Sequence, residues 1–437
     1  MSSLPSMEAV QAPDFREQCY WWDATPAPAL PDGAIPARAD VVVIGSGYTG
    51  LSAALQLARG GRDTVVLDAA DAGWGCSTRN GGQVGTGLKP GFADLSKIHG
   101  PQRAFDMVKE GHNALAFTEE FVGSEAIDCS WERVGRFIGA HNPKSYDTLA
   151  RRVASQPKGL EDDSHIVPRA EQSAEIGSDS YHGGAVYPRH AAVDPARLHR
   201  GMLDRVLAAG ARVIGHCAAQ SIARDGKGFV VETVRGRIAA RDVLVATNGY
   251  TGNLSRYLRR RVIPIGSYVI ATEPFDPEVG RTLIPKARVI TDTRRVIFYY
   301  RLSPDRRRVV FGGRVAASET DPRRTAPKLY AAMTGIFPQL STIRVTHSWN
   351  GFVAYTFDTM PHLGRFDGIW HAMGYCGAGC ALATYFGMRV GQQMLGKAEG
   401  KTALDATAFP TRFYYSGNPW FLAPAVVWKQ ALDRTRL

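Results

Sequence analysis

The hexapeptide Gly45-Ser46-Gly47-Tyr48-Thr49-Gly50 has the spacing of a turn that binds a diphosphate. In such a turn the first glycine permits the tight bend, the second lets the backbone approach a pyrophosphate, and the third allows close helix–strand packing. The amides at the start of the following helix favour the bound anion. Asp68 follows at roughly the 20-residue distance at which an acidic side chain binds ribose hydroxyls. This spacing predicts a dinucleotide site, with an ordinary glycine-rich turn as the alternative.

The residues around this turn have the pattern of a βαβ unit. Residues 39–44 are a continuous run of small and β-branched side chains, typical of a strand buried on both faces. Residues 51–60 favour a helix with a small-residue face, and residues 64–68 favour a second strand. These elements fit within about 30 residues, as a dinucleotide fold requires.

Three later segments favour FAD over NAD. Residues 73–85 form a glycine-dense polar loop, suited to a backbone clamp along the diphosphate and isoalloxazine of an extended FAD. A second buried strand ends in small polar residues at 246–250. A third glycine-rich loop, 374–380, precedes a long helix at 381–395, whose N-terminus can stabilise the negative charge of a reduced flavin.

Several motifs can be compared with known families. They are residues 45–54, Arg79-Asn80-Gly81-Gly82-Gln83, 246–250, Tyr300-Arg301-Leu302-Ser303, Phe311-Gly312-Gly313, Trp349-Asn350-Gly351, 358–364 and the late glycine loop. Together they resemble the D-amino-acid oxidase superfamily of FAD-dependent oxidoreductases (glycine, sarcosine and D-amino-acid oxidases), and most closely its γ-glutamylputrescine oxidase branch. The resemblance covers roughly residues 20 to 430. It implies an α/β fold, with a Rossmann-like FAD-binding domain of the GR2 type and an inserted α+β substrate domain built on a large mixed β-sheet.

The order of the expected elements predicts that these domains are discontinuous. Residues 1–37 form an N-terminal arm anchored by its tryptophans. Residues 38–90, 191–258 and 346–415 form the FAD-binding domain, and residues 91–190 and 259–345 form the substrate-binding domain. Residues 416–437 form a C-terminal tail that we expect to pack on the body; contact with a membrane surface is the alternative.

The resemblance also implies which residues contact FAD. Ala219 would contact adenine through its backbone. The residues expected near the ribityl chain, phosphates and flavin are Ser77, Thr78, Arg79, Asn80, Gly81, Gly82, Gln83, Thr247, Asn248, Tyr250, Gly377, Gly379, Cys380, Ala381 and Leu382.

Two departures from the family pattern bear on the chemistry. Sarcosine oxidases bond the flavin through a cysteine, but residues 350–355 contain none, so we predict non-covalent FAD. They also use a lysine to speed oxygen reduction, and the strand expected at 308–314 has no lysine. Oxygen, giving H₂O₂, is the first expectation for the electron acceptor, and a quinone is the alternative.

Oxidation of an amine by hydride transfer to flavin N5 needs a neutral nitrogen held in a dry site, with reacting atoms about 3–3.5 Å apart. The candidate catalytic residues are therefore positioning groups. Tyr300 is expected on a strand facing the flavin, with a core tyrosine as the alternative. Arg301 and Arg314 can pair with a carboxylate, with surface positions as the alternative. Arg79 beside the flavin would favour the anionic reduced ring.

Composition limits the other possibilities. The net charge is +11, but the basic runs are short, so we expect a basic rim that guides an anionic cofactor or substrate and no nucleic-acid partner. Six scattered cysteines and the lack of a secretory pattern favour a cytoplasmic protein. Cys376 and Cys380 have no second ligand pair, so we expect no metal, with a redox disulfide as the alternative.

The sequence therefore predicts an FAD-dependent enzyme that oxidises a C–N bond in a small amine or amino acid, of γ-glutamylputrescine or N-alkyl amino acid type, to an imine that hydrolyses. A dehydrogenase that passes electrons to a quinone and a non-catalytic flavin-binding subunit are the alternatives.

Overall fold

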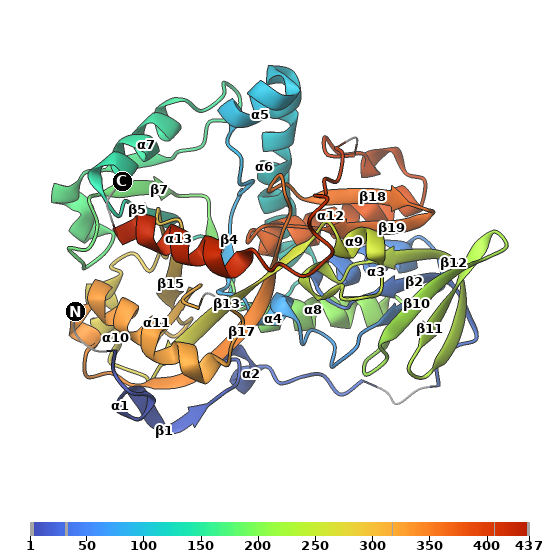
Figure 1. Ribbon diagram of the computed structural model, residues 1–437, viewed down its shortest axis with the longest axis horizontal. Coiled ribbons are helices and arrows are strands. Elements are labelled where there is room, and N and C mark those ends of the chain that lie inside the picture. Colours follow the sequence, from blue (N-terminus) through green and yellow to red (C-terminus); the bar gives the residue numbers. More distant parts are fainter. Residues whose placement is uncertain (1–3, 31–33, 317, 406, 435–437) are drawn as a thin grey trace.

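The computed structural model describes residues 4–30, 34–316, 318–405 and 407–434. Its strands form two large sheets, one on each side of a central region in Figure 1. Within these residues no helix has both the length and the apolarity needed to cross a bilayer.

The first sheet has eight strands and contains the expected βαβ unit. Its central strands run parallel, and the valines and isoleucines of β2 and β3 are buried because they meet helices on one face and apolar side chains on the other. In spatial order the main path is β10 (Ala219–Asp225), β11 (Gly228–Thr233), β12 (Gly236–Val245), β2 (Arg38–Ile44), β3 (Thr64–Leu67) and β9 (Arg212–Ile214). Strand β12 also pairs with β19 (Ile369–Met373), which pairs with β18 (His362–Phe366).

Two helices that begin near the ends of these strands pack tightly against each other. They are α3 (Tyr48–Arg59) and α12 (Gly379–Met394). A Cβ placed on Gly387 would lie 2.4 Å from the carbonyl oxygen of Thr49, and one on Gly391 would lie 3.0 Å from that of Ala53. The small side chains of α3 therefore serve helix–helix contact as well as packing on the sheet. Helices α6 (Pro101–Ser124) and α8 (Pro195–Ala208) complete this core.

The second sheet has nine strands, of mixed direction. In spatial order they are β1 (Gln11–Arg16), β17 (Val345–Tyr355), β13 (Ile263–Thr272), β16 (Val309–Gly313), β15 (Phe298–Leu302), β14 (Val289–Asp292), β5 (Arg136–Gly139), β7 (Gly184–Tyr187) and β6 (His165–Val167). Apolar side chains pack between it and helices α10 (Pro277–Leu283) and α11 (Pro322–Ile336). Helices α5 (Phe92–His99) and α7 (Pro143–Ala154) belong to the first inserted segment, and the short strands β4 (Gln83–Val84) and β8 (Ala191–Ala192) pair with each other just outside its two ends.

This architecture confirms the expected fold class. Two segments have features that the sequence did not predict. Strand β17 begins at residue 345, close to where the FAD-binding domain was expected to resume, yet it lies in the nine-stranded sheet. It is held there by a long antiparallel register with β13, from Ile263 opposite Tyr355 to Ala271 opposite His347. The expected extended arm contains two one-turn helices, α1 (Met7–Val10) and α2 (Trp21–Ala24), and strand β1, which pairs with the outer edge of β17.

The tryptophans of the arm bind the glycine-dense loop at 73–85. The indole of Trp21 is buried and donates to the carbonyl oxygen of Asn80 at 2.9 Å. The indole of Trp22 donates to the Thr78 hydroxyl at 3.0 Å. The arm thus holds this loop from the side of the nine-stranded sheet.

The C-terminal segment also has a defined position. In Figure 1 helix α13 (Leu422–Arg434) runs outward from the centre of the molecule across the half that holds the nine-stranded sheet. The C-terminal segment therefore packs on the body of the protein, which was the expectation preferred over contact with a membrane surface.

Replacing Trp21 by alanine tests the role of the arm. The Trp21→Ala variant should lose about 3–5 kcal/mol of unfolding free energy, because it leaves a cavity and an unpaired Asn80 carbonyl. Trp428, which is 66% exposed on α13, is the matched control, and Trp428→Ala should change stability by less than about 0.5 kcal/mol. Denaturant unfolding checks both; equal small losses would contradict an anchoring role for Trp21.

Candidate functional site

A single cavity of about 1300 Å³ extends from the turn at 45–50 to the inner face of the nine-stranded sheet. Ordinary small-molecule pockets enclose roughly 300–1,000 Å³. The cavity is therefore large enough for an extended dinucleotide together with a second small molecule. Its walls come from both sheets, from the loop at 73–85, and from α13.

Two of the three glycines in the turn are required by the protein's own packing. Gly45 has φ +105°, and a Cβ there would lie 2.9 Å from the carbonyl oxygen of Ala246. A Cβ on Gly50 would lie 1.8 Å from the carbonyl oxygen of Gly45, so α3 can approach β2 only without one. A Cβ on Gly47 would meet only the Ser77 side chain, at 2.8 Å. Gly47 lines the cavity, so its missing side chain leaves room for a bound group.

Asp68 lies at the end of β3 and ties the second strand to the turn. One of its carboxylate oxygens accepts hydrogen bonds from the Ser46 amide at 3.0 Å and the Ser46 hydroxyl at 2.6 Å; the other accepts from the Ala70 amide at 3.1 Å. A carboxylate has about four lone-pair sites. Asp68, which lines the cavity, therefore keeps acceptor capacity for a ribose hydroxyl.

His199 of α8 forms a hydrogen bond with the turn at 45–50. The sequence analysis did not predict this residue. Its Nε2 donates to the carbonyl oxygen of Ser46 at 2.7 Å. Burial lowers the pKa of His199, so the ring remains neutral and can hold this donor in place. A lone histidine in a helix carries no spacing signal, which explains why sequence reasoning missed it.

The loop at 73–85 begins with helix α4 (Cys76–Arg79), and its side chains have two different functions. The Ser77 hydroxyl accepts from the Tyr48 amide at 3.0 Å, next to the N-terminus of α3. The Thr78 hydroxyl donates to the carbonyl oxygen of Gly73 at 2.6 Å and faces the arm. The predicted residues of this loop that line the cavity are Ser77, Arg79, Asn80, Gly81 and Gln83. Thr78 and Gly82 lie outside the cavity lining, so we assign them to loop structure instead of direct contact.

Arg79 is held against the cavity wall by fixed partners. Its guanidinium donates to the carbonyl oxygens of Trp74 at 2.7 Å and Asn350 at 3.1 Å. It also lies 4.6 Å from the ring centroid of Trp22 and 4.2 Å from that of Trp74. Burial lowers the pKa of Arg79 somewhat, yet a guanidinium remains charged near neutral pH. The site therefore has a permanent positive charge at this wall.

The late glycine loop and the N-terminus of α12 also line the cavity and contact the loop at 73–85. Gly377 has φ +93° and open space where a Cβ would lie. Cys380 donates to the Asn80 side-chain oxygen at 3.2 Å, and burial raises the pKa of its thiol to about 12. Gly377, Gly379 and Cys380 line the cavity; Ala381 and Leu382 are buried in the core behind it. Cys376 and Cys380 are both free thiols.

The residue predicted to contact adenine and the three predicted to flank the ribityl chain and phosphates also line the cavity. They are Ala219 and, in the segment after β12, Thr247, Asn248 and Tyr250. The Asn248 side-chain oxygen accepts from the Gly374 amide at 2.9 Å, which links this segment to the late glycine loop.

Two of the four predicted catalytic positions do not face the cavity. Tyr300 is fully buried in the core on the far face of the sheet, where its hydroxyl pairs with that of Tyr181 at 2.8 Å. Successive side chains of a strand point to opposite faces, so Tyr299 lines the cavity in its place. Arg301 is buried and donates to the carbonyl oxygens of Gly82 at 2.9 Å and Val193 at 2.8 Å. The expectation for these two residues was therefore wrong.

Arg314 does line the cavity, but it is already engaged. Its guanidinium donates to the Glu319 carboxylate at 2.8 Å and to the carbonyl oxygen of Gly266 at 2.7 Å. This ion pair leaves Arg314 less suited to a substrate carboxylate than the sequence suggested.

Comparison with known proteins agrees with this geometry. The family model described as FAD dependent oxidoreductase (DAO) matches residues 40–393. The chain belongs to this family. It is 34% identical to the probable oxidoreductase OrdL of Rhizobium meliloti, over 95% of this chain and 97% of that one. It is 32% identical to the gamma-glutamylputrescine oxidoreductase of Escherichia coli, over 88% of this chain and 89% of that one. Glycine oxidase from Geobacillus kaustophilus has the same fold, with a TM-score of 0.70 at 19% identity over 87% of this chain and all of that one.

Membership of the DAO family confirms FAD as the cofactor and the chain as an FAD-dependent oxidoreductase. The residues present fit that cofactor. The glycine cradle at 45–50 is open to the cavity, and Asp68 keeps acceptor capacity at one end. The late glycine loop offers open backbone at Gly377. In a member of the DAO family these groups would hold the diphosphate, the ribose and the flavin edge, respectively.

Gly47 offers a test of cofactor binding that spares the fold. Its backbone is extended, with φ −71° and ψ −178°, and the Ser77 hydroxyl it would meet can rotate away. The Gly47→Ala variant should therefore fold but bind FAD about 5- to 150-fold more weakly, because the added methyl crowds the diphosphate.

Titration of apoprotein with FAD, followed by flavin fluorescence, measures this change. Gly123→Ala is the matched control, because a Cβ there has open space within 4 Å. Unchanged affinity in Gly47→Ala would place the diphosphate elsewhere.

Proposed function

We propose that this protein oxidises a C–N bond in a small amine or amino acid, and that the resulting imine is hydrolysed to a carbonyl compound. FAD, when bound, supplies the acceptor for the hydride removed from the carbon next to nitrogen. One observation carries the proposal: the cavity is continuous from the diphosphate turn to the inner face of the substrate sheet. The relation to a gamma-glutamylputrescine oxidoreductase supports an amine as the substrate.

The chain's own residues can position such a substrate and keep it dry. Tyr299 presents its hydroxyl to the cavity, held by the Ser267 hydroxyl at 2.9 Å, and burial raises its pKa to about 12. It therefore acts as a neutral hydrogen-bonding group and not as a base. Ile263, Ile265 and Val353 give an apolar wall beside it. A dry wall favours the neutral amine that hydride transfer requires.

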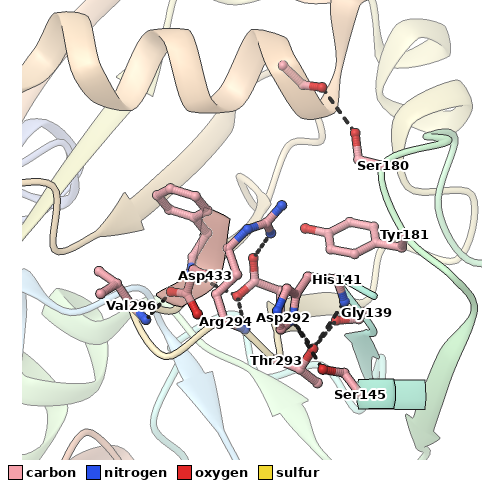
Figure 2. Close-up of polar contacts among 12 residues, drawn as sticks. Gly139, His141, Ser145, Ser180, Tyr181, Asp292, Thr293, Arg294, Val296 and Asp433 are labelled. Carbon is pink, nitrogen blue, oxygen red and sulfur yellow. Dashed lines mark hydrogen bonds and ion pairs between the residues drawn. The ribbon is translucent and has the colours of Figure 1, made fainter. Parts of the chain in front are cut away.

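Helix α13 shields the same region from solvent. Phe421, Leu422 and Val426 line the cavity. The Asp433 carboxylate near the end of the helix accepts from the amides of Arg295 at 2.9 Å and Val296 at 3.0 Å. Figure 2 shows this contact beside the buried pair of Asp292 and Arg294. The helix is thus fixed to the loop between β14 and β15.

We also propose that the FAD is not covalently bound. Three of the thiols that line the cavity are Cys76, Cys376 and Cys380, and burial raises their pKa to about 11, about 11 and about 12. Protonated thiols are poor nucleophiles. Denaturation should therefore release all flavin into the soluble fraction; flavin that stays with the precipitated chain would contradict this.

Molecular oxygen, reduced to H₂O₂, is the proposed acceptor, and a quinone is the second candidate. Strand β16 carries no lysine, and the exposed aromatic residues Phe413, Trp420 and Trp428 favour a membrane-associated acceptor. Anaerobic titration with amines and N-alkyl amino acids should bleach the flavin if the proposed reaction is right. Aerobic turnover that releases peroxide supports oxygen, and turnover that requires added quinone supports the alternative. Flavin that no amine bleaches would favour a non-catalytic subunit.

Substitution of two neighbouring tyrosines on β15 tests which of them acts in the reaction and which only stabilises the fold. Tyr299→Phe should lower kcat/KM by about 2- to 10-fold, because it removes one hydrogen bond to the bound amine. Tyr300→Phe should leave kcat/KM unchanged and cost about 1 kcal/mol of stability through the lost contact with Tyr181. Steady-state kinetics and thermal unfolding of both variants check this; the reverse pattern would return Tyr300 to the site.

A further inference from the structure

The C-terminal segment carries a group of large apolar side chains that the body of the protein does not cover. Of the eleven large hydrophobic side chains that are exposed in the described residues, five lie between residues 413 and 428, with exposed fractions from 45% to 94%. They are Phe413, Tyr414, Trp420, Val427 and Trp428. Single exposed apolar side chains are ordinary, whereas such a group on one short segment marks an interaction surface.

The aromatic rings before α13 form one continuous patch. The ring centroids of Phe413 and Tyr414 lie 5.3 Å apart, and those of Tyr414 and Trp420 lie 6.4 Å apart. Phe421 lies 5.8 Å from Trp420 and also lines the cavity. The patch is therefore anchored to the body through Phe421, while its other rings face solvent.

Helix α13 extends this patch, because its packing on the body uses only one of its faces. Leu422, Ala425 and Val426 line the cavity. The exposed apolar positions, at the i, i+3, i+4, i+7 spacing of a single helix face, are Pro424, Val427, Trp428 and Ala431. A helix that is apolar all round is normally covered on every side. The outer face of α13 therefore lacks a partner within the described part of the chain.

The charges on this segment have one sign. Residues 406–432 contain two cations, Arg412 and Lys429, and no aspartate or glutamate. Both cations are exposed. The Arg260 guanidinium donates to the carbonyl oxygen of Tyr415 at 3.2 Å, which places a third cation beside the segment. The patch is thus bordered by positive charge and suits a negatively charged partner.

We propose that this surface, residues 412–431, docks on a lipid membrane that has anionic headgroups. Tryptophan and tyrosine rings favour the boundary between headgroups and acyl chains, because they are apolar with one hydrogen-bonding end. Cations beside them are attracted to anionic headgroups. Helix α13 lies along the membrane surface, since its 13 residues are fewer than the roughly 20 needed to span a bilayer. The proposal goes beyond the proposed reaction and does not depend on it.

A second copy of the chain fits this surface less well. In a dimer with two-fold symmetry the same patch meets itself. Arg412, Lys429 and Arg260 would then approach their own copies, and residues 406–432 offer no acidic side chain to pair with them. Like charges brought together at an interface oppose association. An anionic membrane neutralises the same charges.

Flotation with lipid vesicles tests the surface on the holoenzyme, without any turnover. The wild type should bind vesicles of phosphatidylglycerol and phosphatidylcholine in equal parts, and should bind vesicles of phosphatidylcholine alone at least about tenfold more weakly. Trp420→Ala and Trp428→Ala should each weaken binding to the mixed vesicles by about 5- to 50-fold, because each removes one apolar ring from the membrane. Arg412→Gln should weaken it by about fivefold.

Ile98 is the matched control. It is exposed on α5, next to the exposed cation Lys97, but it lies outside the patch. Ile98→Ala should therefore bind the mixed vesicles like the wild type. Thermal unfolding of Trp428→Ala, Arg412→Gln and Ile98→Ala should give a Tm close to that of the wild type, because all three side chains are exposed.

Two results with vesicles would overturn the proposal. One is the absence of binding to the mixed vesicles. The other is binding that both tryptophan variants leave unchanged, because the net charge of +11 alone would then hold the protein on the lipid.

Sedimentation without lipid tests the second copy as the occupant. A monomeric wild type supports the membrane. A wild type that self-associates, together with a monomeric Trp428→Ala, would assign the surface to another copy and overturn the proposal. Bleaching of the flavin by amines is measured without lipid, so a failure of this proposal is distinguishable from a failure of the proposed function.

Discussion

The whole site depends on the close approach of backbone to backbone at the turn between β2 and α3. A Cβ on Gly50 would lie 1.8 Å from the carbonyl oxygen of Gly45, and a Cβ on Gly387 of α12 would lie 2.4 Å from the carbonyl oxygen of Thr49 on α3. These contacts let two helices begin at the same cavity. Because the first amides of a helix attract negative charge, the arrangement gives one cavity two places suited to the anionic parts of a flavin dinucleotide.

The loop at 73–85 joins this helix pair to the nine-stranded sheet. The indole of Trp349 on β17 donates to the carbonyl oxygen of Arg79 at 2.8 Å, and the side-chain amide of Gln83 donates to the carbonyl oxygens of Ile290 and Tyr300. Arg301 and the two tryptophans of the arm hold the same loop from behind. Both sheets therefore fix the loop, so its cavity-facing residues have little freedom relative to either one.

Sequence reasoning succeeded where local spacing carries the physical signal. The turn, the buried strand before it and Asp68 form a short unit whose geometry depends on neighbours in the chain. It failed for Tyr300, because a shift of one residue in a strand exchanges the two faces and no pattern in 296–302 marks which face is covered. Arg136, which also lines the cavity, was missed for a different reason: its place follows from the parallel pairing of β5 with the distant β14, where it lies opposite Val289.

The order in which the strands enter the eight-stranded sheet has a consequence for biogenesis. Strands β2 and β3 come early in the chain, but α12, which covers α3, lies close to its other end. During synthesis the apolar face of α3 must stay uncovered until the ribosome has made most of the protein. Contacts between segments so distant in sequence form slowly, and apolar surface that is prone to aggregation stays exposed until they have formed. The α3–α12 contact on which the cavity depends can therefore form only after α12 has been synthesised.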